Sequence, residues 1–195
     1  ILCFGTLNPD LIYFVDELPN KGDDIRSLKS SIRPGGTAIN CSELISLWNK
    51  SVHVRGNSIG SDPMGKYLVD YLKENNINFD GLIINQSLTP TCSIFVDSSG
   101  ERTIVSSGYE GLEWSNFENL NNFDSLIIDR YSIKFIKDKL KDLKKQNNLF
   151  VCQAGYEYEI NYKLDFLIVS KDEISVDEAN NPVSYTHLTL PTSSQ

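Results

Sequence analysis

The sequence predicts an α/β fold with a mainly parallel sheet, flanking helices and a small separate β layer. Along residues 1–181, short apolar runs of strand length alternate with stretches whose apolar residues recur at helical spacing. Other stretches alternate apolar and polar residues beside turn signals, which is typical of hairpins and exposed ribbons. We therefore expect the parallel sheet to form the core and the ribbons to stand outside it.

The chain should open with extended segments. Residues 1–5 indicate a buried strand, and after a break at Asn8-Pro9 the run 11–15 continues as a second extended piece. Residues 24–32 are polar with apolar side chains at spaced positions, which suits an exposed ribbon better than a core helix. Pro34-Gly35-Gly36 ends this ribbon.

Two helices are marked by their ends. Apolar residues at helical spacing predict a helix over residues 37–48, followed by Asn49 where a left-handed cap is tolerated. After a short strand at residues 52–54, Gly60-Ser61-Asp62-Pro63 combines a capping side chain with proline in the first turn. An amphipathic helix over residues 64–73 is therefore expected.

A β-hairpin and a further strand-helix-strand series follow. The hairpin is predicted from residues 92–96 and 102–105, which flank a turn at Asp97-Ser98-Ser99-Gly100. Beyond it we expect buried strands and one Lys-rich surface helix, in the order strand 125–128, helix 132–146, strand 149–152 and strand 166–169. Strands that alternate with helices favour a parallel sheet.

The charge and the N-terminus narrow the classes of partner. Asp and Glu number 26 against 18 Lys and Arg, so the formal net charge of −8 disfavours nucleic acid. The first residues carry no basic leader and no long apolar stretch, so we expect no export signal, no membrane association and a cytoplasmic location. The cysteines lie far apart and form no C-x-x-C pair, so we expect reduced and mostly buried thiols.

Residues 182–195 differ in character from the rest of the chain. They contain no charged side chain and no periodic apolar face, and the stretch 183–192 resembles the translation of a transposon-end adapter used in DNA library preparation. We therefore expect a non-native tail from about Pro182 onward, with the C-terminal half of the domain missing. A natural Thr-rich tail is the alternative.

Three motifs combine polar residues with glycine. Gly5-Thr6-Leu7-Asn8-Pro9-Asp10, Pro34-Gly35-Gly36-Thr37-Ala38-Ile39-Asn40 and Ile59-Gly60-Ser61-Asp62-Pro63-Met64-Gly65 follow one another along the chain. A carboxylate accepts two sugar hydroxyls and an amide exchanges both donor and acceptor roles, so such residues suit a polyol. Glycine lets the backbone approach a ligand closely. Taken singly, the same residues also suit an Asx turn and an ordinary tight turn.

In this order the motifs resemble the G-x-x-N-x-D, G-G-x-x-x-N and G-x-D-x-x-G segments of the ribokinase-like (PfkB) carbohydrate kinases. Scattered further matches resemble the ketohexokinase-like members. The resemblance implies a ribokinase-like sheet, with the N-terminal part of the domain at residues 1–181. It also implies that the sugar is held by the set Asn8, Asp10, Gly35, Gly36, Thr37 and Asn40.

The resemblance further implies a lid over the sugar, made of residues 11–33 and 90–106, which would exclude water from the reaction. Arg102 is a candidate to bind a substrate phosphate or other anion, although an arginine after a turn is also commonly just solvated. A homodimer formed through the lid remains an open alternative. A plain edge hairpin is the other interpretation of residues 92–105.

The implied activity of the parent protein is transfer of a phosphoryl group from ATP, with Mg²⁺, to a hydroxymethyl group of a sugar. The family's catalytic D-T-x-G-A-G-D motif does not occur in residues 1–195, so no catalytic residue is assigned and the fragment is expected to be inactive. The usual N-x-x-E motif of the Mg-ATP shell is also not evident, and Asp172, Glu173 or Glu178 are loose substitutes. Neither the particular sugar nor the oligomeric state follows from the sequence.

The sequence motifs also bear on three other functions. A nucleoside kinase of the same fold and a noncatalytic sugar-binding module remain alternatives. A dinucleotide-binding oxidoreductase is disfavoured because no G-x-G-x-x-G turn follows the first strand, and no P-loop motif is present.

Overall fold

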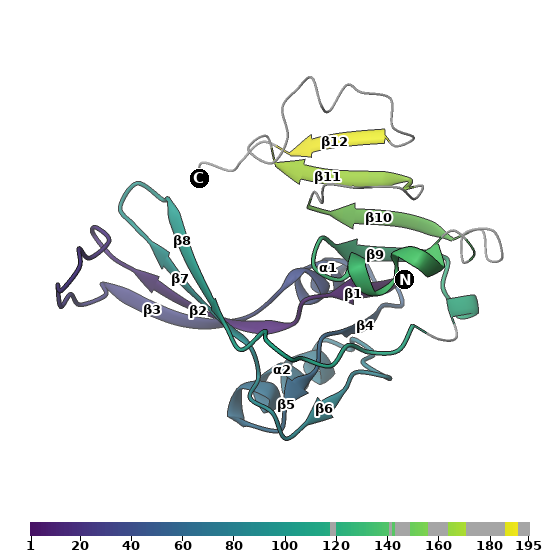
Figure 1. The fold of residues 1–195 in the computed structure, drawn as a ribbon, viewed down its shortest axis with the longest axis horizontal. Coiled ribbons are helices and arrows are strands. Elements are labelled where there is room, and N and C mark those ends of the chain that lie inside the picture. Colours follow the sequence, from purple (N-terminus) through teal and green to yellow (C-terminus); the bar gives the residue numbers. More distant parts are fainter. Residues whose placement is uncertain (118–119, 141, 143–148, 156–163, 171–185, 191–195) are drawn as a thin grey trace.

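The computed structural model describes residues 1–117, 120–140, 142, 149–155, 164–170 and 186–190. Its main sheet is parallel throughout, with the strand order β12-β11-β10-β9-β1-β4 (Figure 1). These strands are β1 (Leu2–Gly5), β4 (His53–Gly56), β9 (Ser125–Asp129), β10 (Phe150–Ala154), β11 (Phe166–Ser170) and β12 (Thr186–Leu190). The predicted parallel α/β sheet is confirmed.

The strand β12 is a difference from the sequence-based expectation, which placed no element in residues 182–195. The structure pairs β12 with β11 at the edge of the sheet. Residues with β-branched and apolar side chains at positions 186–190 have high strand propensity, and a sheet edge offers unpaired backbone groups to any such segment. A non-native origin of residues 182–195 stays a prediction.

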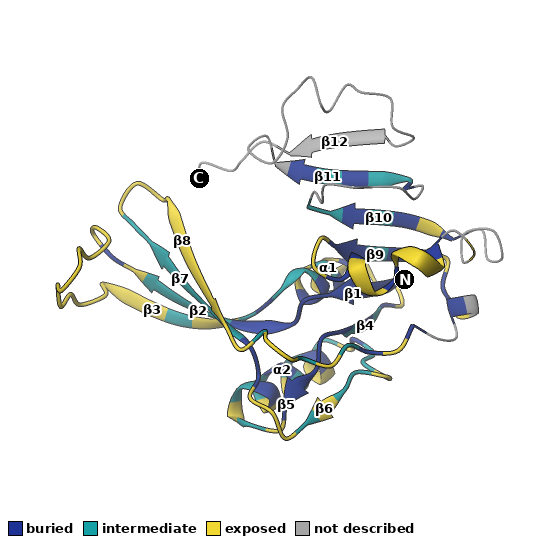
Figure 2. Ribbon diagram, viewed as in Figure 1, coloured by how far each residue is buried: buried dark blue, intermediate teal, exposed yellow. Residues whose placement is uncertain are grey.

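A second, mixed sheet stands away from the main sheet (Figure 1). Its strand order is β3-β2-β7-β8, in which β2 pairs antiparallel with β3 and parallel with β7, and β7 pairs antiparallel with β8. The strands are β2 (Asn8–Phe14), β3 (Lys29–Gly35), β7 (Thr91–Val96) and β8 (Arg102–Ser107). We call these four strands the lid sheet. Figure 2 shows its outer strands β3 and β8 mainly exposed and its inner strands β2 and β7 mainly half-buried, whereas β1 and β9 of the main sheet are mainly buried.

Two boundaries of the lid sheet differ from prediction. The ribbon expected over residues 24–32 is the strand Lys29–Gly35, and the break expected at Asn8-Pro9 lies inside β2. Pro9 is tolerated there because it faces Pro34 across the β2/β3 pair, while the pairing of β2 with β7 begins only at Asp10. Neither proline is therefore required to donate a backbone hydrogen bond.

Two apolar clusters cover the two faces of the main sheet. β1 contributes to both, since Leu2 and Phe4 belong to one cluster and Cys3 to the other. This division follows from the alternation of side chains along a strand.

The described helices are α1 (Thr37–Leu47), α2 (Pro63–Glu74) and the 3-10 helices η1 (Leu120–Asn122) and η2 (Ile133–Phe135). The short strands β5 (Ile59–Gly60) and β6 (Ile84–Asn85) pair in parallel.

The predicted helices at residues 37–48 and 64–73 are confirmed as α1 and α2, and Asn49 has the expected positive φ of 55°. Of the Lys-rich helix predicted over 132–146, the structure describes η2 and a helical turn at residues 137–140. Most of the rest of that prediction lies outside the described residues. None of the helices described here has the length and apolar character needed to cross a bilayer.

The four cysteines are free thiols, as predicted, although only Cys3 is fully buried. Burial raises the pKa of Cys3 and Cys152, and it raises the pKa of Cys41 to about 11. These three thiols therefore stay protonated at neutral pH, which makes them poor nucleophiles.

A buried amide fastens the start of the lid sheet to the main sheet. Asn57 lies directly after β4 and is completely buried. Its side chain accepts a hydrogen bond from the Leu7 amide at 2.8 Å and donates to the Leu7 carbonyl at 3.0 Å. Because Leu7 joins β1 to β2, this pair of bonds fixes the peptide that leads from one sheet to the other. We call it the Asn57 clamp.

Asp62 caps α2 and ties it to the segment that leads into β7. Its carboxylate accepts from the Gly65 amide at 2.8 Å and from the Thr89 amide and hydroxyl at 2.9 and 2.6 Å. Burial alone would raise the pKa of Asp62, but the hydrogen bonds from Thr89 and the helix amides outweigh it and hold the pKa below its usual range. The capping prediction made for this motif is confirmed.

Replacing Asp62 by alanine is expected to lower the free energy of unfolding by about 2 kcal/mol at neutral pH, because a cap and the partners of Thr89 are lost. A lowered native pKa contributes stability above the unfolded pKa of about 3.9, and this contribution is lost as pH falls through the native value. Wild type and Asp62→Ala should therefore converge in acid. Urea denaturation at several pH values measures this, with the exposed Asp70→Ala in the same helix as control. Equal destabilisation by both variants would contradict the capping role.

Candidate sugar-binding site

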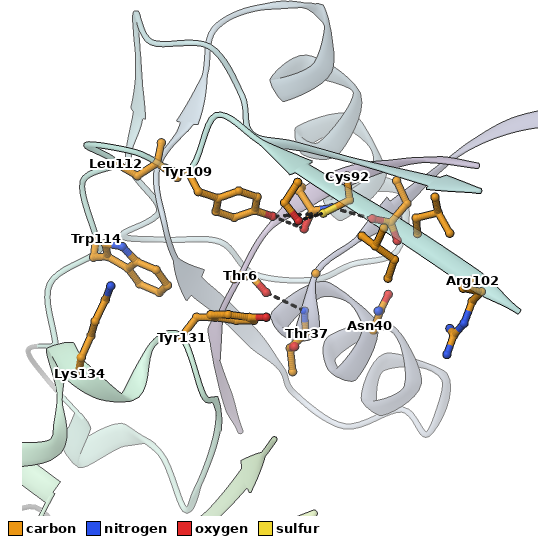
Figure 3. A pocket seen from close by; sticks show the side chains of 16 residues that line it. Thr6, Thr37, Asn40, Cys92, Arg102, Tyr109, Leu112, Trp114, Tyr131 and Lys134 are labelled. Atoms are coloured by element: carbon orange, nitrogen blue, oxygen red, sulfur yellow. Dashed lines mark hydrogen bonds between the residues drawn. The ribbon is translucent and has the colours of Figure 1, made fainter. Parts of the chain in front are cut away.

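A cavity of about 660 Å³ lies between the lid sheet and the carboxyl end of β1 (Figure 3). Sites in parallel α/β sheets commonly lie at this end of the strands. Its wall combines polar groups with several aromatic rings, and the lining residues are Thr6, Asn8, Asp10, Gly36, Thr37, Asn40, Cys92, Ile94, Arg102, Ile104, Ser106, Tyr109, Leu112, Trp114, Tyr131 and Lys134. All predicted site residues except Gly35 line this one cavity.

Asp10 projects from β2 and is held in place by Asn8. The Asn8 amide donates to the Asp10 carboxylate at 2.6 Å, while the Asn8 carbonyl oxygen accepts from the Tyr109 hydroxyl at 2.8 Å. Asn8 is only 2% exposed, so both ends of its side chain are used within the protein. Asn8 therefore orients Asp10, and a direct contact between Asn8 and a sugar stays a prediction.

Burial shifts the pKa values of two groups at this site. Burial raises the pKa of Asp10, and the hydrogen bond from Asn8 opposes that rise only in part. Burial likewise raises the pKa of Tyr109, so its hydroxyl stays protonated and donates to Asn8 at neutral pH. The chain Tyr109, Asn8, Asp10 thus leaves the free lone pairs of a partly desolvated carboxylate facing the cavity.

The two glycines serve a purpose different from the one predicted. A Cβ on Gly35 would collide with the Asp10 carboxylate, and a Cβ on Gly36 would collide with the Thr6 carbonyl and lie 2.9 Å from the Asn8 side-chain oxygen. The expected reason was space for the sugar itself. In the structure the glycines make room for the protein's own polar groups, and Gly36 also has a positive φ of 84°. Gly35 thus shapes the site by allowing Asp10 to lie against the backbone.

The first two amides of α1 are used within the protein and are not free for a ligand. The Thr37 amide donates to the Thr6 hydroxyl at 3.1 Å, and the Ala38 amide donates to the Thr6 carbonyl at 3.2 Å. The Thr6 hydroxyl in turn donates to Asp129 at 2.9 Å. Thr6 therefore joins the start of α1 to the end of β9, and Thr37 contributes to the cavity as a lining residue.

Asp129 was not predicted as a site residue. Its carboxylate is 1% exposed and accepts hydrogen bonds from the Thr6 amide and hydroxyl and from the amides of Tyr131 and Ser132. These bonds account for its burial, since a buried carboxylate requires donors. The available signal was an aspartate placed directly after the buried strand predicted at residues 125–128.

Asn40 lies on the exposed side of α1 and not on its apolar face. Asn40 is exposed and lines the cavity from the second turn of α1, because the buried face of the helix is formed by Ala38, Ile39, Ser42 and Ile45. Arg102 is also exposed and lines the cavity from β8. Both side chains are therefore accessible to a ligand in the cavity.

The aromatic part of the wall was not predicted from the sequence. Tyr109, Trp114 and Tyr131 lie in segments without strand or helix periodicity, so no pattern placed them. Figure 3 shows Leu112, Trp114 and Lys134 at one end of the cavity and Arg102 at the other. The lid sheet thus supplies both polar and apolar side chains to the cavity, whereas the end near η2 is mainly aromatic.

Replacing Tyr109 by phenylalanine is expected to weaken sugar binding about fivefold, because the Asn8 carbonyl loses its donor and Asn8 no longer holds Asp10 firmly. The loss of unfolding free energy should be about 1 kcal/mol. Titration calorimetry and urea denaturation measure the two effects. Tyr13→Phe is the matched control, since the Tyr13 ring stacks on Phe95 in the lid sheet and does not line the cavity. Unchanged binding by Tyr109→Phe would contradict the orienting role of Asn8.

No group of three or more His, Cys, Asp and Glu side chains is gathered for metal binding within the described residues. The candidate Mg²⁺ ligands Asp172, Glu173 and Glu178 lie outside the described residues. Those predictions accordingly stay predictions.

The fold is shared with solved ribokinases. A crystal structure of a putative ribokinase from Agrobacterium tumefaciens superposes with a TM-score of 0.73 at 17% identity, covering 88% of this chain and 59% of that chain. The structure of Arabidopsis thaliana ribokinase complexed with ribose and ATP superposes with a TM-score of 0.72 at 18% identity, covering 88% and 60%. The parallel sheet with its mixed lid sheet is therefore a ribokinase-like fold.

The sequence comparison adds the family. The model of the pfkB family carbohydrate kinases matches residues 1–154. A ribokinase from Dictyostelium discoideum is 25% identical over 173 residues, which cover 88% of this chain and 48% of that protein. The chain belongs to the pfkB family of carbohydrate kinases, and it spans about half the length of this curated relative.

Proposed function

We propose that this chain is the sugar-binding part of an ATP-dependent carbohydrate kinase, which transfers a phosphoryl group to a hydroxymethyl group of a sugar. The observation that carries the proposal is the meeting of Asp10, Asn40 and Arg102 around one cavity, although they come from two separate motifs and from the hairpin. Membership of the pfkB family and the ribose and ATP bound by the Arabidopsis ribokinase support it. The lid sheet would cover the sugar and exclude water.

The chain's own groups have definable roles in this function. The Asp10 carboxylate would accept hydrogen bonds from two neighbouring sugar hydroxyls, and Asn40 would exchange a donor and an acceptor with a third. Asn8 and Gly35 would fix Asp10, while Gly36 and Thr37 would complete the wall. No residue of this chain is assigned as the catalytic base, so ATP and Mg²⁺ are cofactors proposed for the whole protein only.

The proposal is tested by sugar binding and by turnover of the 195-residue chain. We expect D-ribose or D-fructose to raise the melting temperature by a measurable amount, and we expect no ADP to form from ATP in the presence of either sugar. A deoxygenated analogue without vicinal hydroxyls serves as the control ligand. Failure of a panel of pentoses and hexoses to stabilise the chain would contradict the sugar-binding role. Sugar-dependent ADP formation would contradict the assignment of catalysis to residues outside this chain.

A nucleoside kinase is the second candidate, because the aromatic end of the cavity offers ring surfaces to a base. Adenosine and ribose compared in the same melting experiment separate the two. Tighter binding of adenosine would favour the nucleoside as substrate.

A further inference from the structure

Asp129 is the last residue of β9 and joins two separate parts of the cavity wall. One carboxylate oxygen, Oδ2, accepts hydrogen bonds from the Thr6 amide at 2.8 Å and from the Thr6 hydroxyl at 2.9 Å. The other oxygen, Oδ1, accepts from the amides of Tyr131 and Ser132 at 3.1 and 2.7 Å. Thr6 and Tyr131 line the cavity, whereas Asp129 does not. The carboxylate therefore holds two lining segments together without itself forming part of the wall.

On one side, the contact with Thr6 extends to α1. The Thr6 hydroxyl donates to Asp129 and accepts from the amide of Thr37, the first residue of α1, at 3.1 Å (Figure 3). A hydroxyl has a single proton, so its donation to the carboxylate leaves its lone pairs for the Thr37 amide. Asp129 therefore fixes the direction of this hydroxyl and, through it, the start of the helix that brings Asn40 to the cavity.

On the other side, the contact extends to the aromatic part of the wall. The Ser132 amide, which Asp129 accepts from, directly precedes η2. Phe135 at the end of η2 stacks on Trp114, with ring centres 4.4 Å apart and planes inclined at 24°. Trp114 is half-buried and lines the cavity. The environment of this indole therefore depends on the position of η2.

Gly5 leaves the space that the Asp129 carboxylate occupies. A Cβ on Gly5 would lie 2.7 Å from Oδ2 of Asp129 and 3.1 Å from its Cγ. The carboxylate could move away only by weakening its hydrogen bonds, because its donors approach from both sides. Gly5 opens the first of the three glycine-containing motifs but does not line the cavity. The absence of a side chain at position 5 thus serves Asp129 and not the ligand directly.

An ionised carboxylate suits position 129 better than a neutral side chain of the same size. Its two oxygens accept from all four donors, whereas an amide would place an NH₂ group where one of these oxygens lies. In either orientation the NH₂ group would face a backbone N–H, of Thr6 on one side or of Tyr131 and Ser132 on the other. Buried donors left without an acceptor are costly. A change from Asp to Asn should therefore release one of the two lining segments.

We infer that Asp129 is a positioning residue for the sugar site. Its carboxylate, which lies against Gly5, sets the spacing between the start of α1 and the part of the wall that contains Tyr131. This inference rests on the proposed sugar-binding function, because the spacing matters for a ligand held by both parts of the wall. Asp129 acts through Thr6 and Ser132 and makes no contact with the sugar.

The test compares Asp129→Asn with a matched control, Asp165→Asn. The Asp165 carboxylate also accepts from a backbone amide, that of Val151 at 2.7 Å, but Asp165 precedes β11 at the amino end of the sheet and does not line the cavity. Both variants are made in a Trp48→Phe background, in which Trp114 is the sole indole. Calorimetric titration with D-ribose and D-fructose gives the sugar affinity, and the emission of Trp114 is recorded without ligand. Urea denaturation identifies the conditions in which each variant is folded.

We expect Asp129→Asn to weaken sugar binding about tenfold. The Trp114 emission of the folded, ligand-free variant should shift to longer wavelength, because η2 is no longer held and the indole is more accessible to water. Asp165→Asn should lower stability without changing the affinity or the emission, so loss of stability alone does not reproduce the result.

Gly5→Ala provides an independent test that keeps the carboxylate, and it decides the matter if Asp129→Asn does not fold. It should weaken sugar binding and shift the Trp114 emission as Asp129→Asn does, because the new Cβ displaces the carboxylate. In an Asp129→Ala background the same Cβ meets no carboxylate, so Gly5→Ala should cause little further change in either readout. If Asp129→Ala does not fold, the single variants Asp129→Asn and Gly5→Ala decide.

Other outcomes overturn the inference. Normal affinity and normal emission in folded Asp129→Asn would mean that Asp129 serves the fold alone. A change in only one of the two readouts would contradict the role as well, because both parts of the wall should move. Fully additive effects of Gly5→Ala and Asp129→Ala would remove the link between these positions. If the wild-type chain binds no sugar, the proposed function fails. The emission shift and the non-additivity then still show whether Asp129 holds the wall.

Discussion

Replacing Asp10 by asparagine is expected to weaken sugar binding by at least about a hundredfold, because two charge-assisted hydrogen bonds become weaker neutral ones. The same variant should be as stable as wild type or more stable at neutral pH. Asn8 can still donate to the side-chain oxygen of an asparagine at position 10, and the partly buried charge is gone. Calorimetric titration and urea denaturation measure the two effects separately.

The pH dependence gives this prediction a second readout. Burial raises the native pKa of Asp10 above its unfolded value, so the ionised form is disfavoured in the folded protein. The contribution of Asp10 to stability therefore falls as pH rises from about 4 through the raised native pKa. The free energy of unfolding of Asp10→Asn should not show this decrease. Sugar affinity of wild type should decrease as pH falls through the same native pKa, since a protonated Asp10 accepts less well.

The exposed Asp16, which does not line the cavity, provides the control as Asp16→Asn. It should change neither the sugar affinity nor its pH dependence. Retention of wild-type affinity by Asp10→Asn, or a clear loss of stability, would show that Asp10 serves the fold rather than the ligand.

Replacing Gly36 by alanine is expected to lower the free energy of unfolding by about 3 kcal/mol or more. With φ 84° and ψ 151°, Gly36 lies in a region that essentially only glycine adopts, which costs an alanine about 1–3 kcal/mol, and the collision of its Cβ with the Thr6 carbonyl adds the cost of an overpacked site. The collision cannot be relieved by a rotamer change, because the atoms struck belong to the backbone. The start of α1 should shift away from Thr6, and sugar binding should be lost with it.

Gly100 separates the two costs. It has a φ of +86°, close to the +84° of Gly36, but an added Cβ would meet nothing within 4 Å. Gly100→Ala should therefore lose only about 1 kcal/mol and retain sugar binding. Urea denaturation of both variants measures the difference. Equal losses would mean that the positive φ alone, and not the contact with Thr6, requires glycine at position 36.

The features predicted well from sequence were those set by local chemistry. The cap at Asp62, the left-handed Asn49 and the turn between β7 and β8 each depend on a few adjacent residues, and each is confirmed. The first two motifs likewise placed Asp10 and Asn40 at one site. Their residue types and order carried that information even though they lie on different elements.

The features that escaped prediction depend on contacts between distant segments. Asp129 accepts hydrogen bonds from Thr6, which lies 123 positions earlier in the chain, and Tyr109 donates a hydrogen bond to Asn8, which lies 101 positions earlier. Neither hydrogen bond corresponds to a periodic pattern in the sequence. The reason for the glycines was also wrong, since only the folded structure shows Thr6 and Asp10 occupying the space beside them. Local patterns thus predicted which residues meet, but not which bonds join them.

The Asn57 clamp bears on how the cavity can open. Asp10 belongs to the lid sheet and Thr37 to the main body, so the two sides of the cavity are carried by different sheets. The only peptide that runs directly from β1 into β2 is immobilised by Asn57 on one side and by the bond from Thr6 to Asp129 on the other. These hydrogen bonds make the junction a poor hinge. Any movement of the lid sheet relative to the main sheet is therefore expected beyond residue 8 and not at this junction.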